Sequence, residues 1–212
     1  MQITTGNSFQ DSQLQRAADA IAGGGLVAFP TDTFFALGAD ALSAAAVAGV
    51  FAAKGRDPGI PVPVLVYDIA MAEQVVSDFP GPLHDLANLF WPGALTIVLP
   101  ASDVVPDVVT AGTGTVGLRV PDHDLARELI ATVDTPLTGT SCNVSGSQPT
   151  KNAKTVCQQF GDKILVLIDA PCGENSLPST VVGLSGNRIR LLRAGAVDND
   201  SLRKIVGDIV VE

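Results

Sequence analysis

The sequence predicts an α/β protein built on a mixed β-sheet. Segments with apolar residues at helical spacing alternate with short apolar runs typical of strands, and some neighbouring strands are separated only by short turns. A chain of 212 residues with 46% hydrophobic and 17% charged residues has the composition of a globular protein. No repeat, low-complexity tract or linker-like shift in composition divides it, so we expect a single domain over residues 1–212.

The first two helices are marked by their ends and their apolar stripes. Residues 12–25 open with a capping box formed by Ser12 and Gln15, and they stop at glycines. Residues 43–55 form a second helix, in which Lys54 continues the core-facing stripe into the loop that follows. This position on the stripe favours a binding site over a solvated helix end.

The remaining helices and strands are predicted by apolar residues at helical spacing and by short apolar runs. We expect strands at 25–30, 62–67, 95–100, 115–121, 163–169, 179–184 and 188–195, a strand-and-turn segment at 136–146, and helices at 82–91, 122–133, 152–160 and 200–210. Pro63 places its strand at a sheet edge or makes it the start of a strand, because proline cannot donate to a ladder.

Charge and cysteine usage exclude several functional classes. The net charge is −9, and the stretch between Asp57 and Leu118 contains no lysine or arginine, which argues against a broad nucleic-acid or membrane surface. The N-terminus has no apolar leader and no apolar run is long enough to span a bilayer. Three cysteines without a C-x-x-C pair fit reduced thiols, so we expect a cytoplasmic protein, and with two histidines we expect no His-based metal site.

One glycine motif imitates a dinucleotide-binding fingerprint. Gly112, Gly114 and Gly117 satisfy G-x-G-x-x-G, but the fingerprint requires a strand before the glycines and a helix after them. Here the glycines lead directly into the strand expected at 115–121. We therefore interpret this motif as a turn.

Two loops at element ends carry candidate anion-binding groups. Thr31 and Thr33 follow the strand at 25–30, where hydroxyl and backbone N–H groups suit a carboxylate or phosphate; an ordinary Thr/Asp turn is the alternative. Lys54 and Arg56 place two cations in a Gly/Pro-rich loop, where arginine can bind a phosphate through two N–H groups. The alternative is a solvated helix end, where the helix dipole favours cations.

Three further sites combine polar groups with strands. Ser141, Asn143 and Ser145 alternate, so an extended chain would project them to one side, although a plain polar turn explains them equally well. Arg119 and Arg193 each interrupt an apolar strand, and a half-buried arginine requires an anionic partner. That partner is either a ligand or one of the chain's own carboxylates.

Taken together, these segments resemble the YrdC-like family of threonylcarbamoyl-AMP synthases. The matching segments run in order over residues 24–197: GGGLVAFPTDTFFALGADA, FAAKGRDPGIPVPVLV, FWPGALTIVLP, TVGLRVPDH, PLTGTSCNVSG and PSTVVGLSGNRIRLLRAGAV. The family's lysine, arginine, serine and asparagine set maps onto Lys54, Arg56, Ser141 and Asn143. The resemblance implies an open, strongly twisted mixed sheet flanked by helices, the YrdC-like fold.

The resemblance also implies a reaction and its site. Members form threonylcarbamoyl-AMP and pyrophosphate from L-threonine, bicarbonate and ATP with Mg²⁺, and a separate transferase moves the threonylcarbamoyl group to adenosine in tRNA. The ATP-binding residues implied are Lys54, Arg56, Thr115, Ser141, Asn143 and Arg193, with Lys54 and Arg56 catalytic. The threonine-binding residues implied are Thr33, Arg119, Gly139 and Ser179. No protein-held metal site is implied, and we expect weak or no stable tRNA binding and no membrane association.

The chain departs from the family pattern at a few positions, and other functions remain open. Asp32 stands where a glutamate is usual, Phe35 and Ala36 replace tyrosine and glycine, and Cys142 replaces an alanine. A noncatalytic YrdC-like RNA-binding module is the main alternative, and a carbamoyl-transfer domain of hydrogenase maturation is another. We expect removal of the Lys54 or Arg56 side chain to leave folding little affected, as for exposed loop charges.

Overall fold

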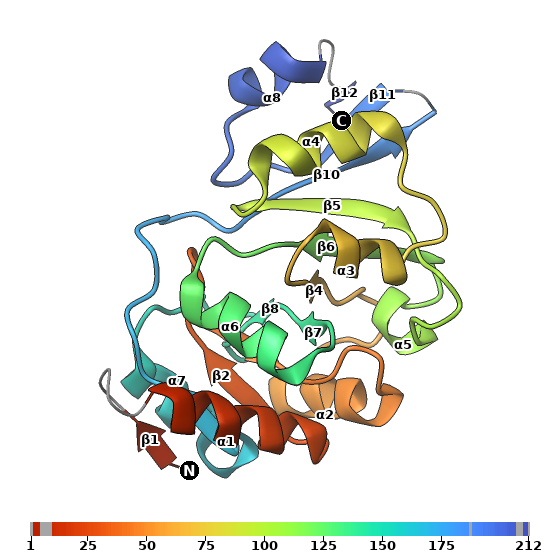
Figure 1. Ribbon diagram of the computed structural model, residues 1–212. Helices are drawn as coiled ribbons and strands as arrows, with labels where there is room; N and C mark the ends of the chain where they lie inside the picture. The colour runs from red at the N-terminus through yellow and green to blue at the C-terminus, as the bar shows by residue number, and fades with distance from the viewer. Residues whose placement is uncertain (1, 5–9, 187, 207–209, 212) are drawn as a thin grey trace.

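Two mixed β-sheets, flanked by helices, make up the computed structural model of the protein (Figure 1). The structure describes residues 2–4, 10–186, 188–206 and 210–211. The α/β class and the mixed pairing are confirmed, and the strands divide between two sheets rather than forming one. Within the described residues, no helix is both long and apolar enough to cross a membrane.

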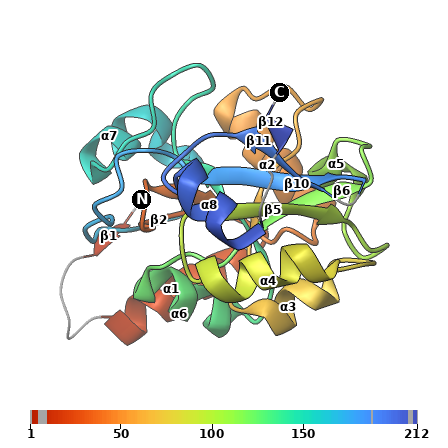
Figure 2. The same cartoon turned by 90° about the horizontal axis from the view of Figure 1, so that it is seen from above.

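The smaller sheet is covered by helices on both faces. Its strand order is β1 (Gln2–Thr4), β9 (Val166–Ile168), β2 (Val27–Phe29), β3 (Ala36–Gly38) and β8 (Thr140–Ser141). Helices α1 (Gln10–Ala22) and α6 (Asp124–Val133) lie on one side, and α2 (Ala44–Lys54) and α7 (Ala153–Phe160) on the other (Figure 2). With both faces buried, strands such as Val27–Phe29 are wholly apolar.

The larger sheet is covered by helices on one face. Its strand order is β12 (Val210–Val211), β11 (Arg188–Arg193), β10 (Thr180–Ser185), β5 (Leu95–Pro100), β6 (Thr115–Arg119), β4 (Val64–Leu65) and β7 (Leu137–Thr138). The remaining helices are α3 (Ile69–Gln74), α4 (Gly81–Phe90), α5 (Asp107–Thr110), α8 (Asn199–Val206) and a 3₁₀ turn, η2 (Gly161–Lys163). Pro63 precedes β4 and so marks a strand start, but β4 lies inside the sheet between β6 and β7.

Alternation along the strands of the larger sheet separates a core face from a polar face. The core face carries Leu95, Ile97, Leu99, Val116, Leu118, Val182, Ile189 and Leu191, which are buried in the main core together with side chains of α3, α4 and α8. The opposite face carries Thr96, Val98, Thr115, Gly117, Arg119 and Val181. Because successive side chains of a strand point to opposite faces, the residues that fill the core also fix which residues remain available for a site.

One segment belongs to both sheets. Its first half, β7, pairs with β4, and after Gly139 its second half, β8, pairs with β3. A Cβ atom on Gly139 would lie 2.5 Å from Cγ of Leu65, so only glycine allows this close approach. The buried hydroxyl of Thr138 accepts a hydrogen bond from the Ala39 N–H at 3.0 Å and donates to the Leu37 carbonyl at 2.9 Å. Thr138 thereby joins β7 to the chain around β3.

Most expected elements are present, with differences at their ends. The first helix begins at Gln10, so Ser12 lies inside it rather than at its cap. The last helix ends at Val206, and Val210–Val211 forms a strand; residues 207–209, which the expected helix included, lie outside the described residues. Strands β1 and β3 and helices α3 and α5 were not predicted, because elements of three to six residues carry little periodicity.

We predict that Thr138→Val destabilises the protein by about 1–3 kcal/mol, measured by urea unfolding. Valine keeps the shape of threonine but leaves the buried Ala39 N–H and Leu37 carbonyl without their partner. Thr132→Val is the matched control, because its hydroxyl is exposed and donates to the Glu128 carbonyl; it should change stability by less than about 0.5 kcal/mol. Equal effects of the two substitutions would contradict a special role for Thr138.

Candidate active site

A cavity of about 590 Å³ lies where the two sheets meet. The smaller sheet and its loops contribute residues of the 31–36 segment together with Thr140 and Ser141, and the larger sheet contributes its polar face. The 60–63 loop and Pro178 add further wall. A volume of this size accommodates a substrate of nucleotide dimensions.

Most of the predicted site residues line this cavity. They are Thr33, Arg56, Thr115, Arg119, Gly139, Ser141, Ser179 and Arg193. Lys54 and Asn143 do not line it and instead lie behind its wall. Residues from six separate segments of the chain therefore converge on one cavity.

Arg119 has a buried carboxylate partner. Its guanidinium forms an ion pair with Asp32, and both side chains are only 7% exposed. Arg119 also donates to the Gly93 carbonyl through Nε at 2.8 Å and to the Thr33 hydroxyl through Nη1 at 3.3 Å. Burial lowers the pKa of Arg119, and the neighbouring Asp32 opposes that change. Of the two alternatives for this arginine, the internal ion pair is present, and the guanidinium still lines the cavity.

Arg193 enters the same cavity without a described carboxylate partner. It donates to the Ser179 carbonyl through Nη2 at 2.7 Å and to the Ser179 hydroxyl at 3.1 Å. That hydroxyl lies 2.8 Å from the hydroxyl of Thr96. The pKa of Arg193 is lowered by partial burial and by the nearby positive charge of Arg119. Arg119 and Arg193 thus line the same cavity near enough for their charges to interact.

Arg56 is held by the loop that follows α2. Gly55 ends the helix with a left-handed φ of 58°, which turns the chain toward the cavity. The guanidinium of Arg56 donates to the Pro61 carbonyl at 2.8 Å, and burial lowers its pKa. The described carboxylates form no ion pair with Arg56, so its charge is available to an anionic ligand.

Lys54 is buried rather than solvated. Its side chain is 2% exposed, and its ammonium donates to the carbonyls of Ser141 and Asn143, the latter at 2.6 Å. Burial lowers the pKa of Lys54 from 10.5 to about 8. The expectation that this charge is an exposed loop cation is wrong, because two carbonyls of a neighbouring loop enclose it.

The 141–147 loop is tied down from several sides. The hydroxyl of Ser141 donates to the Asn143 amide oxygen, and the Asn143 amide group donates to the Ser147 carbonyl at 2.7 Å. The Val144 N–H donates to the Gln159 side chain of α7 at 3.0 Å. Cys142 is fully buried in this loop, and burial raises its pKa to about 12, so it is a packing residue rather than a reactive thiol.

The 31–33 segment forms an ordinary turn and also lines the cavity, so both interpretations of its threonines apply. The Thr31 hydroxyl donates to the Phe34 carbonyl at 2.8 Å, which is the expected turn contact, and it lies 3.1 Å from the Thr33 hydroxyl. Thr33 also lines the cavity next to Arg119. The turn therefore holds a hydroxyl at the surface of the cavity.

Two contributors were not singled out as site residues in the sequence. Thr96 lies on the cavity face of β5, and period-2 alternation against Leu95 and Ile97 could have identified it. Asp32 was noted only as a departure from the family pattern, and nothing local identifies Arg119 as its partner 87 positions away. Among the described residues, no group of three or more His, Cys, Asp or Glu side chains is placed to hold a metal ion.

Comparison with known proteins places the chain in a family. The Sua5/YciO/YrdC family model, described as "Telomere recombination", matches residues 19–195. Threonylcarbamoyl-AMP synthase of Pyrococcus abyssi is 37% identical over 98% of this chain and 61% of its own length. A putative threonylcarbamoyl-AMP synthase of Mycobacterium tuberculosis is 38% identical over 90% of this chain and 88% of its own length.

The solved structures agree with this placement. The crystal structure of Pyrococcus abyssi Sua5 complexed with L-threonine superposes with a TM-score of 0.93 at 36% identity, covering 99% of this chain and 61% of that one. The chain thus spans about three fifths of the length of the Pyrococcus relative. Escherichia coli YciO, at 22% identity and a TM-score of 0.78 over 89% of this chain and 91% of its own, shows the same fold. With its family match, its relatives and its fold in agreement, the chain belongs to the Sua5/YciO/YrdC family.

Proposed function

We propose that the protein is an L-threonylcarbamoyladenylate synthase, a nucleotidyltransferase that joins L-threonine, bicarbonate and ATP and releases pyrophosphate. The observation that carries this proposal is the charge of the cavity. Three arginines, Arg56, Arg119 and Arg193, line it in a chain of net charge −9, and only Arg119 pairs with a described carboxylate. A concentration of positive charge in one hollow of an acidic protein suits anionic substrates.

Threonine would occupy the end of the cavity next to Arg119. The guanidinium would bind the threonine carboxylate, and Thr33, Ser179 and the backbone at Gly139 would supply further polar contacts. Holding the amine of threonine beside bicarbonate replaces an encounter in solution, and such positioning can lower a barrier by about 7–11 kcal/mol. The amine nitrogen forms a bond to the bicarbonate carbon with loss of water, which gives a carbamate. A carbamate oxygen then attacks the α-phosphate of ATP, and the new P–O bond forms as the bond to pyrophosphate breaks.

ATP would occupy the side lined by Arg56, Thr115, Ser141 and Arg193, with Lys54 and Asn143 behind it. Negative charge that develops on the phosphoryl oxygens and on the leaving pyrophosphate would be stabilised by Arg56 and Arg193. Mg²⁺ would enter bound to the ATP phosphates and add charge neutralisation. Neither His84 nor His123 lines the cavity, and we assign no general base.

The noncatalytic RNA-binding alternative has less support. Its electrostatic requirement is a basic surface, which a net charge of −9 opposes. We propose weak tRNA binding, with the product passed to a separate tRNA threonylcarbamoyl transferase. We also propose a cytoplasmic location, consistent with three free cysteines.

Incubation with labelled bicarbonate, L-threonine, ATP and Mg²⁺ tests the function directly. We expect label in threonylcarbamoyl-AMP and release of pyrophosphate that depends on threonine. Labelled adenylate that fails to form, together with sub-micromolar tRNA binding at physiological salt, would instead support the RNA-binding alternative.

We predict that Arg56→Ala weakens ATP binding or slows adenylate formation by about tenfold to a hundredfold, because it removes charge-assisted hydrogen bonds. Arg56→Lys should recover little, since an ammonium cannot reproduce the planar guanidinium fork. The change in unfolding free energy should be about 1 kcal/mol or less. Arg16→Ala, on the exposed side of α1, is the control and should keep the wild-type rate. Wild-type turnover by Arg56→Ala would show that this arginine belongs to a solvated helix end.

We predict that Lys54→Met costs about 1–3 kcal/mol of stability as well as activity, because the Ser141 and Asn143 carbonyls lose their donor. Between pH 8 and 10.5 the unfolded chain binds more protons at Lys54 than the folded protein does. The unfolding free energy of the wild type should therefore rise with pH across this window relative to Lys54→Met, measured by urea unfolding.

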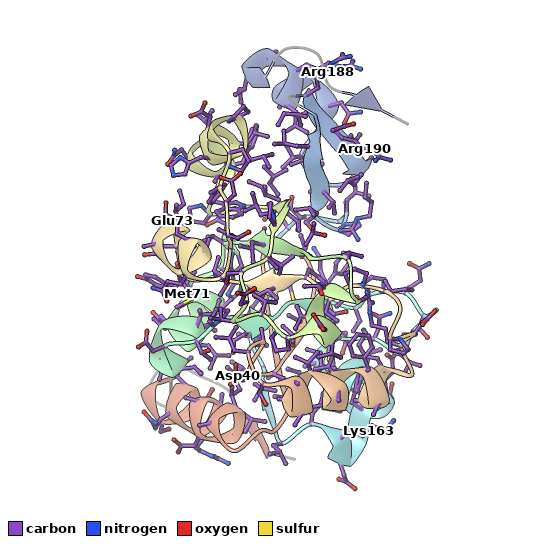
Figure 3. All side chains as sticks on the ribbon, turned by 90° about the vertical axis from the view of Figure 1, so that its right-hand side faces the viewer. Asp40, Met71, Glu73, Lys163, Arg188 and Arg190 are labelled. Atoms are coloured by element: carbon purple, nitrogen blue, oxygen red, sulfur yellow. The ribbon has the colours of Figure 1, made fainter. Side chains whose placement is uncertain are left out.

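Lys163→Met is the control for Lys54→Met. Lys163 is exposed and donates to the Ala53 carbonyl near the same helix end at 3.2 Å (Figure 3). This control should leave both stability and activity close to wild type. A Lys54→Met protein that is as stable as wild type yet inactive would show that Lys54 acts on substrate rather than on the loop.

A further inference from the structure

The cavity must bind a carboxylate and a phosphate at separate positions. Under the proposed function it binds a threonine carboxylate and a polyphosphate at the same time, and Arg119 and Arg193 lie close enough for their charges to interact. Arginine binds carboxylate and phosphate with the same fork of N–H donors. Hydrogen-bond geometry alone therefore does not keep a phosphate away from the arginine that threonine needs.

The two arginines differ in their counter-charge. Arg119 is paired with Asp32 in a buried ion pair, whereas Arg193 donates to Ser179 and forms no ion pair with the described carboxylates. Asp32 does not line the cavity, and it acts from behind Arg119. The charge of Arg119 is thus largely neutralised, whereas no described carboxylate neutralises the charge of Arg193.

The ion pair between Arg119 and Asp32 leaves one carboxylate oxygen without a partner in the described part of the chain, which destabilises the folded protein. Oδ1 of Asp32 accepts from Arg119 and from the Asp122 N–H at 3.2 Å, but Oδ2 is buried with no hydrogen-bond partner among the described residues. A buried carboxylate with an unsatisfied oxygen is unfavourable, and pairing with Arg119 offsets only part of that cost. Its charge is placed to act on whatever Arg119 binds.

We propose that Asp32 is a specificity-determining residue that reserves the Arg119 end of the cavity for a monoanionic carboxylate and directs phosphate groups to Arg193 and Arg56. Coulomb repulsion is proportional to the charge of the ligand, so Asp32 opposes a phosphate dianion twice as strongly as a carboxylate at the same distance. The attraction of Arg119 grows with ligand charge in the same way, so the Arg119–Asp32 pair leaves only a weak net attraction for either anion. Removing a dianion from water costs much more than removing a monoanion, so a weak attraction admits the carboxylate in preference to the phosphate. This inference rests on the proposed function, because it assumes threonine at Arg119.

Competition between threonine and inorganic phosphate tests the proposal. Threonine affinity is measured by calorimetry at about pH 7.5, where phosphate is mainly a dianion, in phosphate and in chloride buffers of equal ionic strength. For the wild type we expect phosphate to change the threonine dissociation constant by less than about twofold. For Asp32→Asn, which keeps the size of the side chain and removes its charge, we expect phosphate to weaken threonine binding about tenfold or more.

Asp122→Asn is the matched control. Its side chain is 68% exposed and lies near the same turn, so its loss should leave threonine binding insensitive to phosphate, as in the wild type. Phosphate that leaves threonine binding to a folded Asp32→Asn protein unchanged would overturn the proposal. Phosphate that displaces threonine from the wild type would also overturn the proposal. This measurement uses the wild type alone, so it does not depend on whether a variant folds.

The measurement of threonine binding in chloride buffer, without phosphate, distinguishes failure of this inference from failure of the proposed function. Threonine binding to the wild type in chloride buffer supports the substrate assignment, whatever phosphate then does. A wild type that binds no threonine there would overturn both the assignment and the role of Asp32.

Discussion

The shared segment from Leu137 to Ser141 is the constraint on which the site depends. Its two halves pair with different sheets, and Gly139 lets them do so against Leu65 without a clash. Thr138 holds the junction through both of its hydroxyl hydrogen bonds. Because the sheets are fixed to each other here, the polar face of one is held opposite the loops of the other, and the cavity between them has a defined shape.

Charge in that cavity is arranged by burial as much as by composition. Lys54 is buried, and its ammonium holds the loop that carries Ser141. This burial lowers the pKa of Lys54. Arg119 is buried with a counter-ion, whereas Arg56 and Arg193 are accessible and form no ion pair with the carboxylates that the structure describes. Cations that look equivalent in the sequence therefore lie in three different environments: one holds a loop, one is paired with a buried carboxylate, and two form no ion pair with a described carboxylate.

The family comparisons and the chemistry of the cavity support different parts of the proposed function. The family match and the superposition with a threonine-bound relative concern most of the chain, whereas the proposed roles of individual residues rest on the cavity. The departures at Phe35, Ala36 and Cys142 are buried, and Cys142 packs in the smaller core. Phe35 and Ala36 also line the cavity, whereas Cys142 is a packing residue only.

The sequence by itself determined the α/β class, most of the longer elements and the candidate cations, because apolar periodicity and capping residues are local signals. It also identified Lys54 as core-facing from its place on a helical stripe. Only the tertiary structure decided that Lys54 holds a loop, that Arg119 pairs with Asp32, and that the strands divide into two sheets at Gly139. Those outcomes depend on contacts between residues about 70 to 90 positions apart, and no local pattern encodes which distant partner a buried charge or a short strand will meet.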